Sequence, residues 1–393
     1  MKNISVHDTV FAPNGAFLSP KEPESNILLK KRWGSTVYCP KPDERRPGSM
    51  YPRAIVLEHN GEKNGTILAT FECYTNDEPV FPIYESTDDA KSWSLKSEVR
   101  DTQLGYGCRF QPHLFEMPCD SGALKEGTIL CAGNIIPNTF TSTALHLYKS
   151  EDAGETWSFV SEIISGGMAH VDDREAGSRP VWEPFIITDP EGKLYIYYSD
   201  ERYANSLKYN QLLAHKYSVD GGLTWSEEKF DVAFADGIQR PGMPIVAALP
   251  GGKYVYVYEN VNVERIPVLF RISEDLDDWG EPDFPGNPVI AKDGRYLTGT
   301  PYVIWIPQGG EEGTILVTGR GFGQIFANSH GGRGFWEPME TLIPIDNSFG
   351  FTGYSQCLVP LHGGRQILSL CPVEISEKLA MIRAAVADVY VRA

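Results

Sequence analysis

The chain has 393 residues, of which 41% are hydrophobic and 22% charged, proportions that are ordinary for a soluble globular protein. Its net charge of −17 argues against nucleic acid or an anionic membrane as a partner, because binding to phosphates needs a basic face. The charge also disfavours a strongly acidic polymer as the substrate, unless a local basic patch is present. No run approaches 18 apolar residues, so no membrane-spanning helix is expected.

Six pairs of short apolar segments follow one another along the chain, and the first segment of a pair often begins at a proline. Their β-branched and aromatic residues predict six hairpins with strands of about five to seven residues. The pairs are YPRAIVLE (51–58) with TILATFE (66–72), QPHLFEM (111–117) with TILCAGN (128–134), WEPFIIT (182–188) with KLYIYYSDE (193–201), GMPIVAAL (242–249) with KYVYVYEN (253–260), TPYVIWI (300–306) with TILVTGRG (314–321), and YSQCLVPL (354–361) with QILSLC (366–371).

A turn motif follows the first five pairs and is clearest in SEDAGETW (150–157) and SVDGGLTW (218–225). STDDAKSW (86–93) is a third copy, with Ala90 and Lys91 where glycine is usual, and SEDLDDW (273–279) and SHGGRGFW (329–336) are degenerate. The Asp can bind backbone N–H groups, the Gly supplies a positive φ, and the Trp is expected to pack between sheets. The motif therefore predicts the turn of a second hairpin and carries no catalytic acid.

Four strands per unit in six units predict an all-β fold, a six-bladed β-propeller that forms one domain over residues 1–393. The sixth unit lacks the turn motif, and the N-terminal segment is expected to supply its outer strand and close the ring. The motif resembles the Asp box of sialidases and related propellers, which makes the expected fold sialidase-like.

A site is expected at the face opposite the turn motifs, where each first strand begins and each second strand ends. Alignment on the proline places at this mouth Tyr51, Gln111, Glu183, Met243, Thr300 and Tyr354, next to Arg53 and His113. The ends of the second strands add Glu72, Asn134, Ser199 with Asp200, Glu259, Arg320 and Pro372. Glu183 and Glu259 are the candidate catalytic pair, because glycoside hydrolysis needs two converging carboxylates. Trp182 and Tyr302 could stack on sugar rings.

The segments MYPRA, VWEPF, YIYYSDER, RPGMP and YVYVYEN resemble those of glycoside hydrolase family 93, the exo-α-1,5-L-arabinanases. The resemblance covers about residues 35 to 390. It implies a retaining enzyme without a cofactor or metal that releases arabinobiose from the non-reducing end of linear arabinan, as in the degradation of plant cell walls. It also implies Glu183 as the acid/base, Glu259 as the nucleophile and Tyr354 as a third catalytic residue, although the two glutamates could have exchanged roles.

The residues expected to bind the substrate are Arg53, His113, Trp182, Asp200, Arg240, Arg320 and Tyr302. The family and its polymeric substrate imply an extracellular, monomeric protein, although the sequence begins without an apolar segment typical of a signal peptide. The long stretches 108–138 and HVDDREAGS (170–178) leave the sugar specificity open.

Three alternatives remain open on the residues alone. A sialidase would need three arginines around the substrate carboxylate, which Arg53, Arg240 and Arg320 could supply, but its Arg-Ile-Pro signature is missing from the first unit. A polysaccharide lyase could use His113 or Tyr354 as its base. A carbohydrate-binding propeller would have affinity for a saccharide without turnover.

Overall fold

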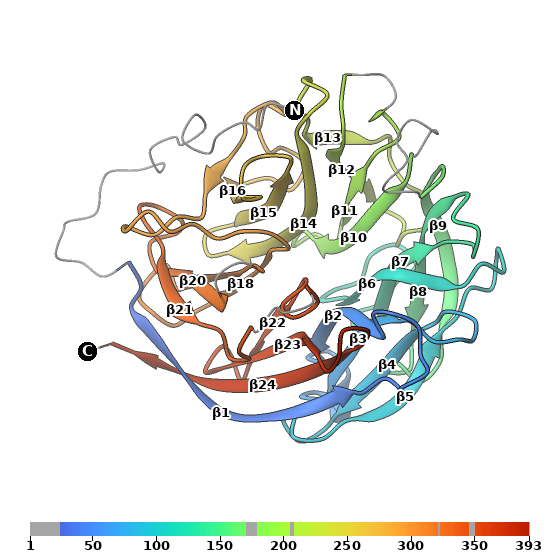
Figure 1. Ribbon diagram of the computed structural model, residues 1–393, viewed down its shortest axis with the longest axis horizontal. Coiled ribbons are helices and arrows are strands. Elements are labelled where there is room, and N and C mark those ends of the chain that lie inside the picture. The colour runs from blue at the N-terminus through green and yellow to red at the C-terminus, as the bar shows by residue number, and fades with distance from the viewer. Residues whose placement is uncertain (1–23, 170–178, 205–207, 321–322, 346–349, 393) are drawn as a thin grey trace.

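The computed structural model describes residues 24–169, 179–204, 208–320, 323–345 and 350–392. Six four-stranded antiparallel sheets surround a central axis as the blades of a propeller (Figure 1). Within the described residues, the secondary structure consists of strands and one turn of 3-10 helix, Gly61–Lys63. The expected all-β, six-bladed propeller is confirmed.

The strands of a blade follow one another outward from the axis. The first three blades consist of β2(Ser49–Val56), β3(Ile67–Cys73), β4(Phe81–Ser86) and β5(Ser94–Val99); β6(Cys108–Glu116), β7(Ile129–Ile135), β8(Thr143–Ser150) and β9(Ser158–Gly166); and β10(Val181–Thr188), β11(Leu194–Asp200), β12(Leu212–Ser218) and β13(Lys229–Val232).

The next two blades have the same order, and the sixth uses both ends of the described chain. They consist of β14(Arg240–Leu249), β15(Lys253–Val261), β16(Val268–Ser273) and β17(Asn287–Pro288); β18(Tyr302–Ile306), β19(Thr314–Thr318), β20(Gln324–Asn328) and β21(Glu337–Glu340); and β22(Cys357–Leu361), β23(Gln366–Glu374), β24(Ala380–Val391) and β1(Ile27–Tyr38). Strand β1 pairs with β24 from Ile27 opposite Val391 to Tyr38 opposite Ile382 (Figure 1). An early strand thus completes the last blade and closes the ring.

Each Ser-x-Asp turn is held by its own side chains. Asp152 accepts hydrogen bonds from the Ser150 hydroxyl (2.7 Å) and from the backbone N–H groups of Glu155 (3.1 Å) and Thr156 (2.9 Å). The turns at Asp88 and Asp220 repeat this pattern. The first turn tolerates Ala90 at a φ of 63° where glycine is usual.

The tryptophan after each of these turns connects it to the preceding blade. Nε1 of Trp157 donates to Oγ of Ser97 (3.0 Å), and that hydroxyl donates to the Gly154 carbonyl (2.5 Å). The same set of bonds joins Trp225, Ser161 and Gly222, and also Trp93, Ser35 and Ala90. Because these turns connect the third and fourth strands, they lie at the opposite face from the start of the first strands. They hold neighbouring blades together and leave the other face for the site.

The core is a set of apolar layers between neighbouring blades. The Trp336 ring packs on Phe270 of the preceding blade at 5.3 Å between centroids, and Trp279 packs on Tyr197 at 6.2 Å. All seven cysteine thiols are free, and five of them are buried. Within the described residues there is no group of three or more side chains placed to hold a metal ion, and no helix long and apolar enough to cross a membrane.

Candidate active site

A residue with a positive φ stands at or before the start of every innermost strand. These residues are Tyr51, Gln111, Glu183, Met243, Thr300 and Ser355, with φ between 44° and 62°. Residues with a side chain rarely adopt this conformation, and in β2, β6, β10 and β14 it coincides with a bulge in the strand pairing. The first five are the positions that the alignment on proline placed at the mouth. In the sixth blade the positive φ falls on Ser355, one residue after Tyr354, because Gln356 stands where the other blades have proline.

Side-chain oxygens around the axis accept the backbone N–H groups of these strained residues. Four such bonds run between neighbouring blades, from Gln111 N to Glu72 Oε1 (3.0 Å), Glu183 N to Gln111 Oε1 (3.1 Å), Met243 N to Glu183 Oε2 (2.6 Å) and Thr300 N to Glu259 Oε2 (2.6 Å). The bonds satisfy donors that would otherwise be buried without a partner. They also fix three glutamates in position.

These glutamates line a cavity of about 320 Å³ at the mouth. Its walls contain Pro47, Met50, Glu72, Tyr74, Phe110, Gln111, Trp182, Glu183, Arg240, Glu259 and Tyr354. The structure therefore brings together all three expected catalytic residues and two of the seven expected binding residues, Trp182 and Arg240. The cavity combines aromatic walls with a few convergent polar groups, as saccharide sites do.

Gly242 lies between the two candidate catalytic carboxylates. A Cβ atom built on Gly242 would be 3.6 Å from Oε2 of Glu183 and 3.7 Å from Oε1 of Glu259, and the sum of these distances is an upper limit to the separation of the two oxygens. This limit is compatible with the carboxyl separation of about 5–5.5 Å in retaining glycosidases. It is shorter than most of the separations of about 6.5–9.5 Å in inverting ones.

Burial changes the protonation of all three carboxyl groups. It raises the pKa of Glu259 to about 7, and the nearby Glu183 charge adds to this, whereas the hydrogen bond from Thr300 N opposes it. Burial also raises the pKa of Glu72 to about 7. The pKa of Glu183 is raised by burial too, but the Ser199 hydroxyl (2.6 Å), the Arg240 charge and Met243 N oppose the rise. The ionised form of Glu183 is stabilised by two hydrogen bonds and the Arg240 charge, and that of Glu259 by one hydrogen bond and the charges of Arg240 and Arg320.

Glu201 is a buried residue that sequence reasoning missed. Its Oε1 accepts hydrogen bonds from Nη2 of Arg240 (2.6 Å) and Nε1 of Trp182 (3.1 Å), and so orients two walls of the cavity. Asp200, the neighbour that sequence reasoning chose, instead pairs with Arg202 (2.7 Å) and does not line the cavity. Successive side chains of a strand point to opposite faces, so Ser199 and Glu201 lie on the side of Glu183 and of the wall residues, and Asp200 lies on the other side. Counting two residues forward from Ser199 would have found Glu201.

Arg53 and His113 also lie outside the cavity walls. The Arg53 guanidinium donates to the Ser355 carbonyl (3.0 Å) and hydroxyl (2.9 Å) and lies 3.9 Å from the Tyr51 ring centre and 5.0 Å from that of Tyr302. Nδ1 of His113 accepts the backbone N–H of Ile186 (3.2 Å). Burial holds the pKa of His113 well below its usual value, so this imidazole is neutral.

Arg320 and Tyr302, the last two expected binding residues, also lie outside the walls of the mouth cavity. The Arg320 guanidinium lies 5.8 Å from the Tyr354 ring centre, donates to the Gly350 carbonyl and lowers the pKa of Glu259 through its charge. It supports the site from outside the cavity walls. Tyr302 lines a different cavity. The segment 170–178, which was expected to reshape the cleft, lies outside the described residues.

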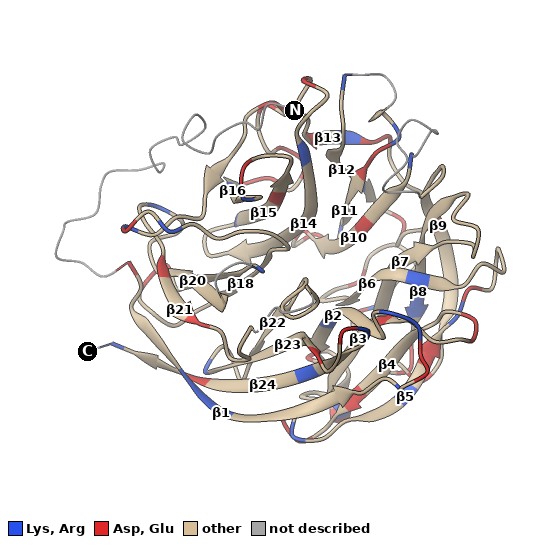
Figure 2. Cartoon of the chain, in the orientation of Figure 1, with Lys and Arg blue, Asp and Glu red and all other residues tan. Residues whose placement is uncertain are grey.

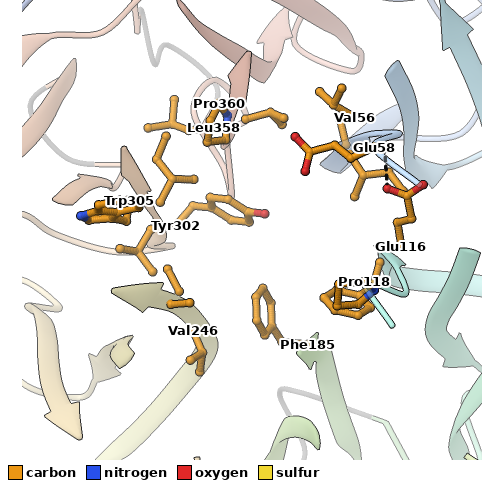
Figure 3. Close-up of a pocket in the computed structure, with 18 of the residues that line it drawn as sticks. Val56, Glu58, Glu116, Pro118, Phe185, Val246, Tyr302, Trp305, Leu358 and Pro360 are labelled. Atoms are coloured by element: carbon orange, nitrogen blue, oxygen red, sulfur yellow. Dashed lines mark hydrogen bonds between the residues drawn. The ribbon is translucent and has the colours of Figure 1, made fainter. Parts of the chain in front are cut away.

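That second cavity, of about 430 Å³, opens between the other ends of the innermost strands. Figure 3 shows Phe185, Val246, Tyr302 and Leu358 around it, with Glu58 and Glu116 at one side. The Glu116 carboxylate is occupied by the backbone N–H groups of Glu58 (2.7 Å) and His59 (3.0 Å). The walls are mostly apolar, and the Glu116 carboxylate already accepts two hydrogen bonds. This cavity is therefore poorly suited to acid–base chemistry.

The mouth cavity, with its paired carboxylates on a six-bladed propeller, has the architecture of a glycoside hydrolase on a sialidase-type scaffold. A scan against protein-family models gave no match, and a search of curated proteins gave none either. Solved structures do match. The α-L-arabinanase of Penicillium chrysogenum, complexed with arabinobiose, is 36% identical with a TM-score of 0.81, over 92% of this chain and 98% of that one.

An α-L-arabinofuranosidase of Fusarium graminearum, in complex with an iminosugar inhibitor, is 32% identical with a TM-score of 0.81, over 91% of this chain and 98% of that one. The chain belongs to the glycoside hydrolase family of these enzymes, GH93, as the resemblance of its motifs implied. The sialidase of Trypanosoma rangeli, at 14% identity and a TM-score of 0.53 over 92% of this chain and 60% of that one, shares the fold.

Proposed function

We propose that this protein is an exo-acting, retaining hydrolase that releases arabinobiose from the non-reducing end of linear α-1,5-L-arabinan. The observation that carries the proposal is the pair Glu183 and Glu259, facing each other across Gly242 in an aromatic-walled cavity. The relatives from Penicillium and Fusarium were each solved with arabinobiose. We further propose an extracellular location, which a polymeric substrate of this kind supports.

In the first step, the Glu259 carboxyl donates its proton to the glycosidic oxygen while the Glu183 carboxylate attacks the anomeric carbon. The bond to the leaving chain breaks and a glycosyl ester of Glu183 forms. Water then attacks the same carbon, Glu259 takes its proton, and the ester bond breaks to free Glu183 and the disaccharide. Two inversions retain the anomeric configuration.

This assignment reverses the roles expected from the sequence, for a physical reason. A nucleophile must be ionised, and the Glu183 carboxylate accepts two short hydrogen bonds whereas that of Glu259 accepts one. A general acid must hold a proton near neutral pH, and the pKa of Glu259 is about 7. Burial and the nearby glutamates keep the pKa of Tyr354 well above 10, so its phenol stays protonated and can donate a hydrogen bond to the substrate or to Glu183.

Digestion of linear arabinan, followed by chromatography of the products, tests the activity. Arabinobiose as the sole early product is expected, and a ladder of longer oligomers or no digestion would contradict the proposal. The anomer released first should have the configuration of the substrate, as followed by NMR.

Azide rescue separates the two roles. With an aryl arabinobioside whose leaving group needs no protonation, Glu259→Ala should be accelerated by azide and give a glycosyl azide of retained configuration. Glu183→Ala should give the inverted azide, because azide then replaces the nucleophile. The opposite pair of products would restore the roles expected from the sequence, and wild-type rates in both variants would refute this site.

The geometry favours a hydrolase over the three alternatives. A sialidase-like cluster would need Arg53, Arg240 and Arg320 in one cavity, and of these Arg240 alone lines it. His113 is neutral, buried and bonded to Ile186 N, a poor position for a lyase base. A binding module would not need two carboxyl groups of different protonation, and it would show affinity without turnover.

A further inference from the structure

Three arginines border the active-site cavity, and we name Arg45, Arg46 and Arg109 the arginine rim. Arg46 immediately precedes the wall residue Pro47, and Arg109 immediately precedes Phe110. The backbone N–H of Arg45 donates to the carbonyl of Tyr74, another wall residue (3.0 Å). The arginine rim is therefore next to three residues of the cavity wall, and its own side chains lie outside that wall.

The arginine rim holds positive charges together without an acidic partner. Among the described residues, no carboxylate lies within 4.0 Å of any of the three guanidinium groups. Other exposed arginines do have an acidic partner, as in the pairs Arg295 with Asp293 and Arg333 with Glu312, both at 2.7 Å. In a chain with a net charge of −17, whose Lys and Arg positions are marked blue in Figure 2, three arginines without an acidic partner are a local basic patch that the overall charge does not suggest.

Two of these side chains are held in fixed positions. Nε of Arg109 donates to the Ile136 carbonyl (3.1 Å) and Nη2 to Oδ1 of Asn138 (2.8 Å), which leaves Nη1 without an acceptor among the described residues. The Arg46 guanidinium lies 4.9 Å from the centre of the Phe351 ring. Burial and the positive charge of Arg45 both lower the pKa of Arg109, which shows that the two charges interact. Fixed, mutually repelling cations gain free energy when an anion binds between them.

We propose that the arginine rim binds a carboxylate on the leaving part of the saccharide, and that the preferred substrate is an arabinan chain attached to a uronate-bearing saccharide. The inference rests on the proposed function, in which the non-reducing end enters the cavity and the rest of the chain leaves across its border. A planar guanidinium matches a carboxylate with two parallel hydrogen bonds, and a neutral arabinan would leave all three cations unused.

Two matched substrate series test the proposal. Arabino-oligosaccharides of three to six units are reduced at the reducing end to neutral alditols or oxidised there to aldonates, which carry one carboxylate. In wild-type enzyme at low salt, kcat/KM for the aldonate of at least one length should exceed that for its alditol by about tenfold. This ratio is the combined effect expected of two or three partly exposed ion pairs. The ratio should fall toward one in 0.5 M NaCl, because salt screens exposed charges.

Arg45→Gln and Arg109→Gln should each lower that ratio. Arg365→Gln is the matched control, since Arg365 is an exposed arginine in the β22–β23 hairpin at the opposite face, and its ratio should equal that of wild type. A wild-type ratio near one at every length, or a high ratio that survives both rim substitutions, would overturn the inference while leaving the proposed function intact. Inactivity on both series would refute the proposed function and the inference together.

Discussion

Glu201 offers a sharp test of how the cavity is built. Its side chain is 2% exposed and pairs with Arg240, which is 16% exposed. Removing one partner of a buried ion pair leaves the other charge uncompensated and costs about 3–5 kcal/mol. Because some water reaches Arg240, we expect Glu201→Ala to lower the free energy of unfolding by about 3 kcal/mol, near the lower end of that range.

Urea unfolding followed by tryptophan fluorescence measures this loss. The control is Glu312→Ala, which breaks an exposed pair with Arg333 (2.7 Å; side chains 41% and 48% exposed) and should cost less than about 1 kcal/mol. If Glu201→Ala loses no more stability than the control, the ion pair does not hold the site together and the reasoning fails.

The more conservative substitution Glu201→Gln should change the pH dependence of catalysis. It keeps an oxygen for Arg240 and Trp182 but removes the negative charge that offsets Arg240 and raises the pKa of Glu183. The pKa of Glu183 should therefore fall, and the acid limb of the pH profile of kcat/KM should move to lower pH. A limb that stays in place or moves to higher pH would show that Glu183 does not set it.

Three further changes test other parts of the structure. Gly242→Ala puts a methyl group between the two carboxylates and 2.9 Å from Nε2 of Gln211, so kcat/KM should fall at least about tenfold, as expected for a misplaced pair; wild-type kinetics would contradict this placement. Ser161→Ala removes the acceptor of Nε1 of Trp225 and should cost about 1 kcal/mol in urea unfolding without changing kcat/KM. The pKa of Glu72 is about 7 in the fold against 4.5 in a free chain, so its neutral form stabilises the protein fully below pH 4.5 and this contribution disappears as pH rises to 7. Glu72→Gln should therefore flatten the fall in unfolding free energy across that window, and a slope equal to that of wild type would count against a protonated Glu72.

The architecture was predictable because its signals are local. Alternating apolar residues specify strands, and Ser, Asp, Gly and Trp within eight residues specify the turn between the third and fourth strands. Even the mouth positions were visible through proline, since Tyr51, Gln111, Glu183, Met243 and Thr300 each precede one. Where proline is missing, at Ser355, the alignment slipped by one residue.

The composition of the site was predictable only in part, because it depends on which face of a strand meets the axis. Asp200 and Glu201 are adjacent acids in one segment, and the fold brings Glu201 to the wall residues Arg240 and Trp182 whereas Asp200 pairs with Arg202. Arg53 and His113 are polar residues near the mouth, yet close packing turns them into buried supports for Ser355 and Ile186 N.

The sequence by itself determined the blades, their number and the two glutamates that face each other, since each is encoded in a short segment or in its repetition. Only the tertiary structure decided the protonation of those glutamates, because burial, hydrogen bonds from the next blade and the Arg240 charge come from residues far apart in the chain. The arginine rim also exists only in the fold, where Arg45 and Arg46 from one loop meet Arg109 from another blade.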